Sequence, residues 1–73
     1  MSELLQRRSL SEQVYDVLIH DIVTGQIALG ARLINRELQT RFGVSSTPIR
    51  DAIDKVYHDG PIAELTNNGA QLI

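Results

Sequence analysis

The chain has 73 residues, which is enough for one small domain and too few for two independent hydrophobic cores. Hydrophobic residues make up 42% and charged residues 22%, a balance that indicates a folded protein and excludes a disordered one. Cysteine is absent, which excludes disulfides and thiolate metal sites. Because no apolar run approaches the roughly 18 residues of a membrane span and no signal-peptide pattern is present, we expect a soluble cytoplasmic protein without a membrane partner.

The formal net charge of −2 by itself argues against nucleic-acid binding, because neutralising phosphates favours an excess of Lys and Arg. The charges are unevenly distributed, however. Residues 1–29 carry two arginines and four carboxylates, and residues 51–73 carry one lysine and four carboxylates. Residues 30–50 carry four arginines and Glu37 as their single carboxylate. Positive charge is therefore concentrated in the middle third of the chain.

The first predicted helix covers residues 10–24. Residues 1–8 have no periodic apolar pattern and are expected to form a flexible leader. Ser9 and Glu12 fit a capping box, and Gly25 suits the left-handed position that follows a helix. Between them, apolar residues recur at helical spacing: Leu10, Val14, Val17, Leu18 and Ile22.

A turn and a short strand are predicted over residues 26–34, followed by a short helix over residues 36–42. Asn35 is a residue type that favours the N-cap of that helix, and Gly43 ends it. Leu38 and Phe42 lie one turn apart and are expected to face the core.

The third predicted helix begins after Ser45, which can cap it, and ends near His58. Pro48 falls in the first turn, where its missing amide hydrogen costs nothing. One apolar stripe is expected to face the core: Ile49, Ala52, Ile53 and Val56. Thr47, Arg50 and Asp54 point the other way, toward solvent or a ligand: Asp54 follows Arg50 by one turn and can pair with it.

Residues 62–65 and 70–73 read as two short strands joined through Asn68 and Gly69, which predicts a β-hairpin. The predicted fold is therefore mainly α with a small β-hairpin: a winged helix-turn-helix of three helices plus a wing, over residues 9–73. In such folds the third helix protrudes, and its N-terminal residues can meet base edges in the major groove of DNA.

Other functions are compatible with this arrangement. A winged-helix module that binds proteins and not DNA is the main alternative, and the acidic last third of the chain favours it. His20 and His58 could be considered as a metal pair, but they stand alone on separate helices without ligand-spaced neighbours. No nucleophile elbow or glycine-rich phosphate loop is present, so we expect no enzyme, no metal site and no cofactor.

The most specific local pattern is the segment 43–53, which reads Gly-Val-Ser-Ser-Thr-Pro-Ile-Arg-Asp-Ala-Ile. This segment resembles the signature of the GntR family of bacterial transcriptional regulators. Other segments are similar to that family at matching separations: residues 22–27, 29–33, 35–38, 59–62 and 68–69. The resemblance covers residues 10–73 and implies sequence-specific binding of double-stranded DNA, with the third helix, about residues 46–58, in the major groove and the wing, residues 62–73, at the minor groove.

Roles for individual residues follow from the resemblance. Arg36 matches a phosphate- or groove-contacting arginine, and Ser45 and Thr47 match hydroxyl residues that hold backbone phosphates. Arg50 matches the arginine directed at the major groove, where a guanidinium can bond guanine O6 and N7. Gly69 matches a wing-tip glycine, and Asn68 beside it is also predicted to bind DNA.

The chain also departs from the family pattern. Ser46 lies in the DNA-binding segment where a basic residue is usual, so one base or phosphate contact is expected to be missing. Asp54 lies one turn after Arg50 on the same face and can pair with it, which lowers the availability of Arg50 to DNA. Pro61 replaces an apolar residue before the wing. With the net negative charge, these departures predict weak binding by the isolated domain.

The resemblance implies partners as well. Two copies are expected to bind a palindromic operator, because one domain of this size covers too few base pairs for selectivity. In the family, a C-terminal domain binds a small-molecule effector and holds a homodimer together. That domain is absent from this chain, so an effector is expected only for the longer protein, in which this domain would serve a repressor or another regulator.

Overall fold

The structure is a computed structural model that describes residues 9–60, 62–66 and 68–73. The expected flexible leader, Pro61 and Asn67 lie outside the described residues. In chain order, the described elements are α2 (Leu10–Thr24), β1 (Arg32–Ile34), α3 (Asn35–Phe42), α4 (Ser46–Asp59), β2 (Ile62–Thr66) and β3 (Gly69–Leu72). Three helices and a small antiparallel wing confirm the predicted winged helix-turn-helix.

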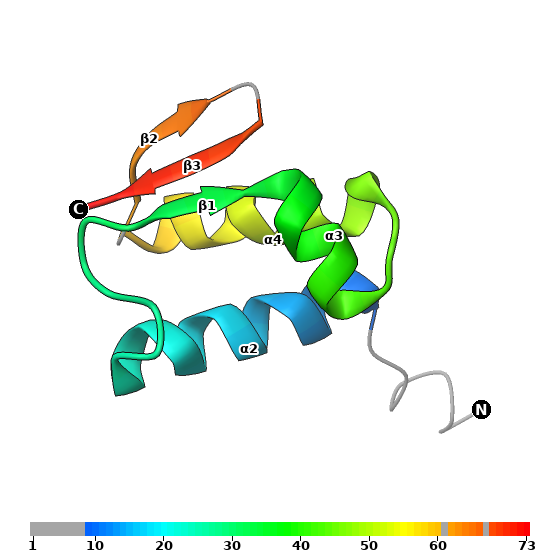
Figure 1. The fold of residues 1–73 in the computed structure, drawn as a ribbon, viewed down its shortest axis with the longest axis horizontal. Coiled ribbons are helices and arrows are strands. Elements are labelled where there is room, and N and C mark those ends of the chain that lie inside the picture. The colour runs from blue at the N-terminus through cyan, green and yellow to red at the C-terminus, as the bar shows by residue number, and fades with distance from the viewer. Residues whose placement is uncertain (1–8, 61, 67) are drawn as a thin grey trace.

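The wing is part of a three-stranded antiparallel sheet with the order β1-β3-β2. The hairpin of β2 and β3 was predicted, and β1 was predicted as a strand, but its pairing with β3 was not. In that pairing Leu33 lies opposite Ala70, and Ile34 lies opposite Gly69. Helix α4 lies between α2 and the sheet, which places the base of the wing against the same helix whose first turn is exposed (Figure 1).

Both ends of α2 follow from its sequence. The Ser9 hydroxyl accepts the Glu12 amide at 3.2 Å, and the Glu12 carboxylate accepts the Ser9 amide at 3.1 Å. Gly25 follows the last turn with φ at 85°, a conformation that favours glycine. The predicted capping box and helix bounds are therefore confirmed.

The predicted side-chain caps of α3 and α4 are wrong. Asn35 is the first residue of α3, and its side-chain oxygen accepts a hydrogen bond from the side-chain amide nitrogen of Gln39 at 2.6 Å. Its backbone N–H donates to the carbonyl of Asn68 at 2.6 Å, so the wing satisfies an amide that the helix leaves free. Ser45 does occupy the N-cap position of α4, but its hydroxyl makes no capping hydrogen bond.

The core joins all three helices to the sheet. It consists of Val14, Leu18, Leu33, Leu38, Ile49, Ala52, Ile53, Val56, Ile62, Ala70 and Leu72. The predicted apolar stripe of α4 is buried, whereas Phe42 is half-buried and packs against the edge of the core. Each fully buried Leu or Ile stabilises the fold by about 1.5–3 kcal/mol. Within the described residues, no helix combines the length and hydrophobicity needed to cross a membrane.

Tyr15 ties α2 to the end of α4. Its hydroxyl donates a hydrogen bond to the carboxylate of Asp59, and the Lys55 ammonium lies 5.1 Å from the centre of its ring. The hydrogen bond to Asp59, with smaller contributions from desolvation and nearby carboxylates, raises the pKa of Tyr15 above its ordinary value. Because the pKa of Tyr15 is raised in the folded state, the hydrogen bond to Asp59 stabilises the fold fully below about pH 10. This stabilisation is lost as pH rises through the folded pKa.

A Tyr15→Phe variant tests this contact. Because phenylalanine keeps the ring and removes the hydroxyl, we expect the variant to be less stable than the wild type at pH 7 to 9. The difference in unfolding free energy should shrink above about pH 10, when the wild-type hydroxyl ionises. Urea unfolding of both proteins across this pH range measures the difference in unfolding free energy. A difference that stays constant with pH would contradict the assigned hydrogen bond between Tyr15 and Asp59.

Candidate nucleic-acid interface

An open hollow lies where α3, the first turns of α4 and the wing tip meet. Its volume is about 350 Å³, and it is lined by Ile34, Asn35, Arg36, Gln39, Ser46, Arg50 and Asn68. Four of the predicted DNA-binding residues, from three separate elements, therefore share one concave surface: Arg36, Ser46, Arg50 and Asn68. We call this surface the HTH hollow.

A second depression, of about 220 Å³, lies between α4 and the wing, and we call it the wing crevice. It is lined by Asn35, Arg50, Ile53, Asp54, Leu65, Thr66 and Gly69. Arg50 and Asn35 line both depressions. Arg50, the arginine predicted to contact bases in the major groove, is thus central to the surface formed by the helix-turn-helix and the wing.

The two arginines of this surface are available to a ligand. Arg36 and Arg50 are both exposed, and within the described part of the chain neither forms an ion pair with a carboxylate. The expected pairing of Arg50 with Asp54 is therefore not found. The Asp54 carboxylate instead faces the ring nitrogen of His58 at 3.7 Å, one turn further along α4. Each guanidinium keeps its donors for an anionic or polar partner.

Ser45 and Thr47 lie at the start of α4 outside both depressions. Both side chains are exposed. Because the Ser45 hydroxyl makes no capping bond, it is free to act as a donor to an external group. These two predicted residues thus border the surface and do not line it.

The wing tip is held against α3. Besides the backbone hydrogen bond from Asn35 to Asn68, the Thr66 hydroxyl donates to the Asn68 side-chain oxygen at 3.2 Å. Gly69 pairs with Ile34 of β1, and a Cβ added at Gly69 would overlap the backbone carbonyl of Leu33. A glycine is therefore required here by the close approach of β1, which the sequence did not reveal.

The family model described as "Bacterial regulatory proteins, gntR family" matches residues 10–71, a range that contains every residue lining the two depressions. The chain belongs to the GntR family of bacterial regulatory proteins. The resemblance noted in the segment 43–53 is thereby confirmed.

Individual relatives of this GntR domain are regulators. It is 36% identical over 69 residues to the HTH-type transcriptional repressor RspR of Escherichia coli (strain K12), covering 94% of this chain and 30% of that protein. It is 35% identical over 51 residues to the probable D-xylose utilization operon transcriptional repressor of Paenarthrobacter nicotinovorans, covering 70% of this chain and 23% of that protein.

A solved structure has the same fold. Lar, which is described as controlling the expression of the Listeria monocytogenes agr system and mediating virulence, matches with a TM-score of 0.78 and 32% identity. The match covers 90% of this chain and 31% of Lar. The GntR domain described here thus spans less than a third of the length of each of these relatives.

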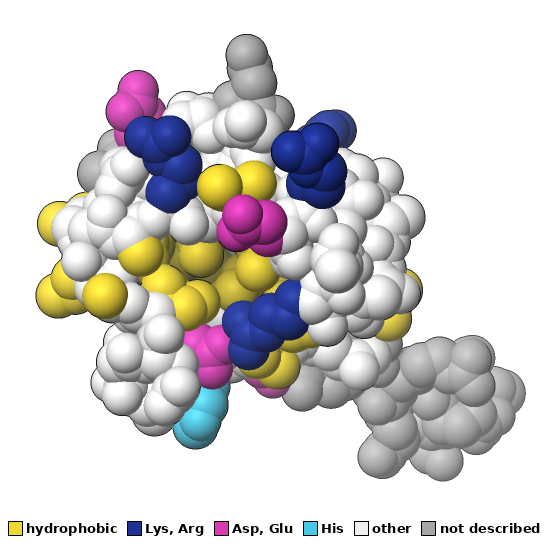
Figure 2. Space-filling view, in the orientation of Figure 1, with side chains coloured by type: hydrophobic (Ala, Val, Ile, Leu, Met, Phe, Trp, Pro, Cys, Tyr) yellow, Lys and Arg dark blue, Asp and Glu magenta, His cyan; other side chains and the backbone are white. Residues whose placement is uncertain are grey.

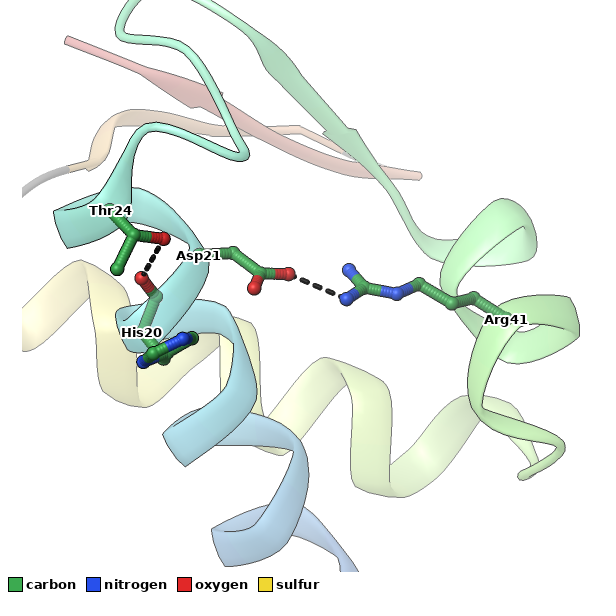
Figure 3. Close-up of polar contacts among 4 residues, drawn as sticks. All are labelled: His20, Asp21, Thr24 and Arg41. Atoms are coloured by element: carbon green, nitrogen blue, oxygen red, sulfur yellow. Dashed lines mark hydrogen bonds and ion pairs between the residues drawn. The ribbon is translucent and has the colours of Figure 1, made fainter.

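An ion pair that the sequence did not predict fixes α3 against α2. The Arg41 guanidinium donates to the Asp21 carboxylate at 2.6 Å across the gap between the two helices (Figure 3). Asp21 is only 6% exposed, which makes it the buried charged residue of the described chain. Since α3 carries Arg36, this pair helps to set the position of one side of the HTH hollow.

Another face of the domain carries a groove lined by both apolar and charged side chains. Hydrophobic side chains gather in a hollow near the middle of the view in Figure 2, with Lys and Arg side chains around it. A groove of about 330 Å³ runs between the segment before β1 and α3, and its lining includes Ile27, Leu38, Arg32 and Arg41. None of the predicted DNA-binding residues lines this groove.

Proposed function

We propose that this GntR domain binds double-stranded DNA at a specific sequence, with α4 in the major groove and the wing at the minor groove. The observation that carries the proposal is the HTH hollow, where two exposed, unpaired arginines meet the start of α4 and the wing tip. A protruding helix with cations beside its first turns fits the shape and the charge of a duplex.

The proposed contacts fall into two groups: those to bases, which recognise the sequence, and those to phosphates, which position the domain on the DNA. Arg50, which lines both depressions, would bond guanine O6 and N7, while Thr47 would lie near the same groove. Arg36 and Ser45 would hold backbone phosphates. Ser46 has a short side chain and would make at most one weak contact.

The wing would contribute from the other side of the phosphate backbone. Asn68, just before β3, and Gly69, its first residue, would lie at the minor groove. Because the wing tip is hydrogen-bonded to Asn35, the position of the wing relative to α3 is preset before DNA binds, which reduces the ordering that binding requires.

The assembly would contain two copies of the domain on a palindromic operator, held as a homodimer in the longer cytoplasmic protein. A C-terminal domain in that protein would bind a small-molecule effector and couple it to DNA binding. The relatives named as repressors support a regulatory role, and we propose repression of transcription and no enzymatic activity.

Two single substitutions distinguish the recognition of bases from the binding of phosphates. Arg50→Ala should weaken binding to the preferred duplex by about 1–3 kcal/mol and relax preference at one base pair. Arg36→Ala should weaken binding to all duplexes alike and reduce the dependence of affinity on salt. Fluorescence anisotropy titrations against the preferred and scrambled duplexes at several salt concentrations measure both effects. Identical binding curves for the wild type and Arg50→Ala would count against the proposal.

A further inference from the structure

Among the described residues that line the HTH hollow and the wing crevice, Asp54 is the one carboxylate. It follows Arg50 by one helical turn on α4, and both side chains line the wing crevice. The Asp54 side chain is 57% exposed. A negative group on a surface that meets a polyanion lowers affinity by repelling phosphates, so its presence here calls for a compensating interaction.

The Asp54 carboxylate can still accept a hydrogen bond from a partner outside the domain. The His58 ring nitrogen lies 3.7 Å from it, which is beyond hydrogen-bonding distance. No ion pair joins Asp54 to Arg50 in the described part of the chain. An ionised carboxylate accepts hydrogen bonds and donates none, so Asp54, whose one ion-pair partner within the ranges that the structure describes is the distant and exposed His58 ring, can receive a donor from a partner.

A duplex offers few donors to a carboxylate in the major groove. Guanine presents N7 and O6, and thymine presents O4, all of which are acceptors and would repel Asp54. Cytosine presents the N4 amino group, and carboxylates on recognition helices accept from it. Adenine presents an N6 amino group, but its N7 acceptor lies beside it and disfavours the second carboxylate oxygen.

The helix geometry places this contact next to the one made by Arg50. Four residues of α-helix advance about 6 Å, which corresponds to roughly two base-pair steps of 3.4 Å. We infer that Asp54 is a specificity-determining residue that accepts a hydrogen bond from a cytosine N4 amino group, one or two base pairs from the guanine read by Arg50. This inference rests on the proposed function.

In this arrangement Asp54 acts mainly by exclusion. Its charge weakens binding to every duplex, and only a correctly placed cytosine offsets that cost. Sequences with guanine or thymine at the same position leave a carboxylate facing acceptors, so they are rejected. The domain would therefore combine low general affinity for DNA with a sharpened preference at one base pair.

Selection of duplexes from a random DNA pool tests the inference. The wild type is compared with Asp54→Ala, Asp54→Asn and the control Asp51→Asn. Asp51 lies on the same helix and is exposed, but it lines neither depression, so its replacement removes the same charge elsewhere. Thermal unfolding of each variant checks that all four proteins are folded, as expected for exposed positions.

We expect the wild type to enrich cytosine at one position near the guanine contacted by Arg50. Asp54→Ala should lose that preference and keep the others, and Asp54→Asn should shift it to adenine, which asparagine recognises through N6 and N7. On sites with guanine or thymine at that position, Asp54→Ala should bind about 5- to 100-fold more tightly than the wild type, while on the wild-type site the two proteins should bind about equally. Asp51→Asn should keep every preference.

Two results would overturn the inference, and they are distinguishable. If the Asp54 variants keep all wild-type preferences and bind every duplex more tightly, Asp54 is only repulsive and the proposed function stands. If the wild type enriches no sequence at any salt concentration, the proposed function fails, and the inference fails with it.

Discussion

Gly69→Ala should destabilise the domain by about 3 kcal/mol or more, because the new methyl group has no space. The added Cβ would overlap the Leu33 carbonyl and would lie 2.8 Å from the Leu33 carbonyl carbon and 3.0 Å from the Ile34 Cα. These are backbone atoms of β1, which cannot move aside as a flexible side chain can. We expect β3 to separate from β1 and the wing to lose its position beside α3.

Urea unfolding followed by circular dichroism measures the loss of stability. Gly30→Ala serves as the control, because Gly30 has a φ of 86° but nothing lies within 4 Å of the position of its Cβ. It should cost only about 1 kcal/mol, from backbone strain alone. If Gly69→Ala kept wild-type stability and weakened DNA binding only, the glycine would serve the minor groove and not the packing of β1.

Arg41→Ala should destabilise the domain by about 2–3 kcal/mol, because it leaves the Asp21 carboxylate buried without its counter-ion. Removing one partner of a fully buried pair typically costs about 3–5 kcal/mol. The Arg41 side chain is 45% exposed, so water screens the pair and the expected cost is lower.

A double-mutant cycle separates the pair from the general loss of a side chain. Asp21→Asn, Arg41→Ala and the combined variant are unfolded in urea, and the double variant should be less destabilised than the sum of the two single ones. Arg36→Ala is the control on the same helix: it removes an exposed, unpaired arginine and should stay within about 0.5 kcal/mol of the wild type. Additive effects at Asp21 and Arg41 would contradict the assigned ion pair.

Elements of the fold that depend on neighbouring residues were predictable from the sequence. The capping box of Ser9 and Glu12 and the left-handed Gly25 set both ends of α2 with local hydrogen bonds and backbone preferences. Helix α4 was predicted to within one residue, because its apolar stripe is regular and Gly60 follows its last turn. Such features require no knowledge of distant segments.

Features that depend on distant residues were not predictable. Strand β1 has three residues and only Leu33 is buried, so its pattern contains no information about its partner, which follows more than thirty residues later. Asn35 was wrongly predicted as the N-cap, because α3 begins at Asn35 itself and its backbone N–H is satisfied by the carbonyl of the distant Asn68. The Arg41 and Asp21 pair joins residues on different helices, at a spacing that no local rule describes.

The candidate site, too, has features that were predictable from the sequence and features that depend on packing in the folded protein. The positions of Arg36 and Arg50 near the starts of two helices were predicted from the family pattern, and the structure places them on one hollow. The expected pairing of Arg50 with Asp54 rested on spacing alone, and the side chains take other directions. Spacing along a helix indicates which side chains can meet, whereas packing decides which ones do.

The central claim is that the surface formed by α3, the start of α4 and the wing tip meets DNA. Backbone amide chemical shifts of the isotope-labelled domain, recorded by NMR during titration with its selected duplex at low salt, test it most directly. We predict that the largest shifts fall at Arg36, at residues 45–47, 49 and 50 and at Asn68 and Gly69, while Ile27 and Leu38 in the groove between the segment before β1 and α3 stay unchanged. Shifts concentrated in that groove, or none at all, would contradict the claim.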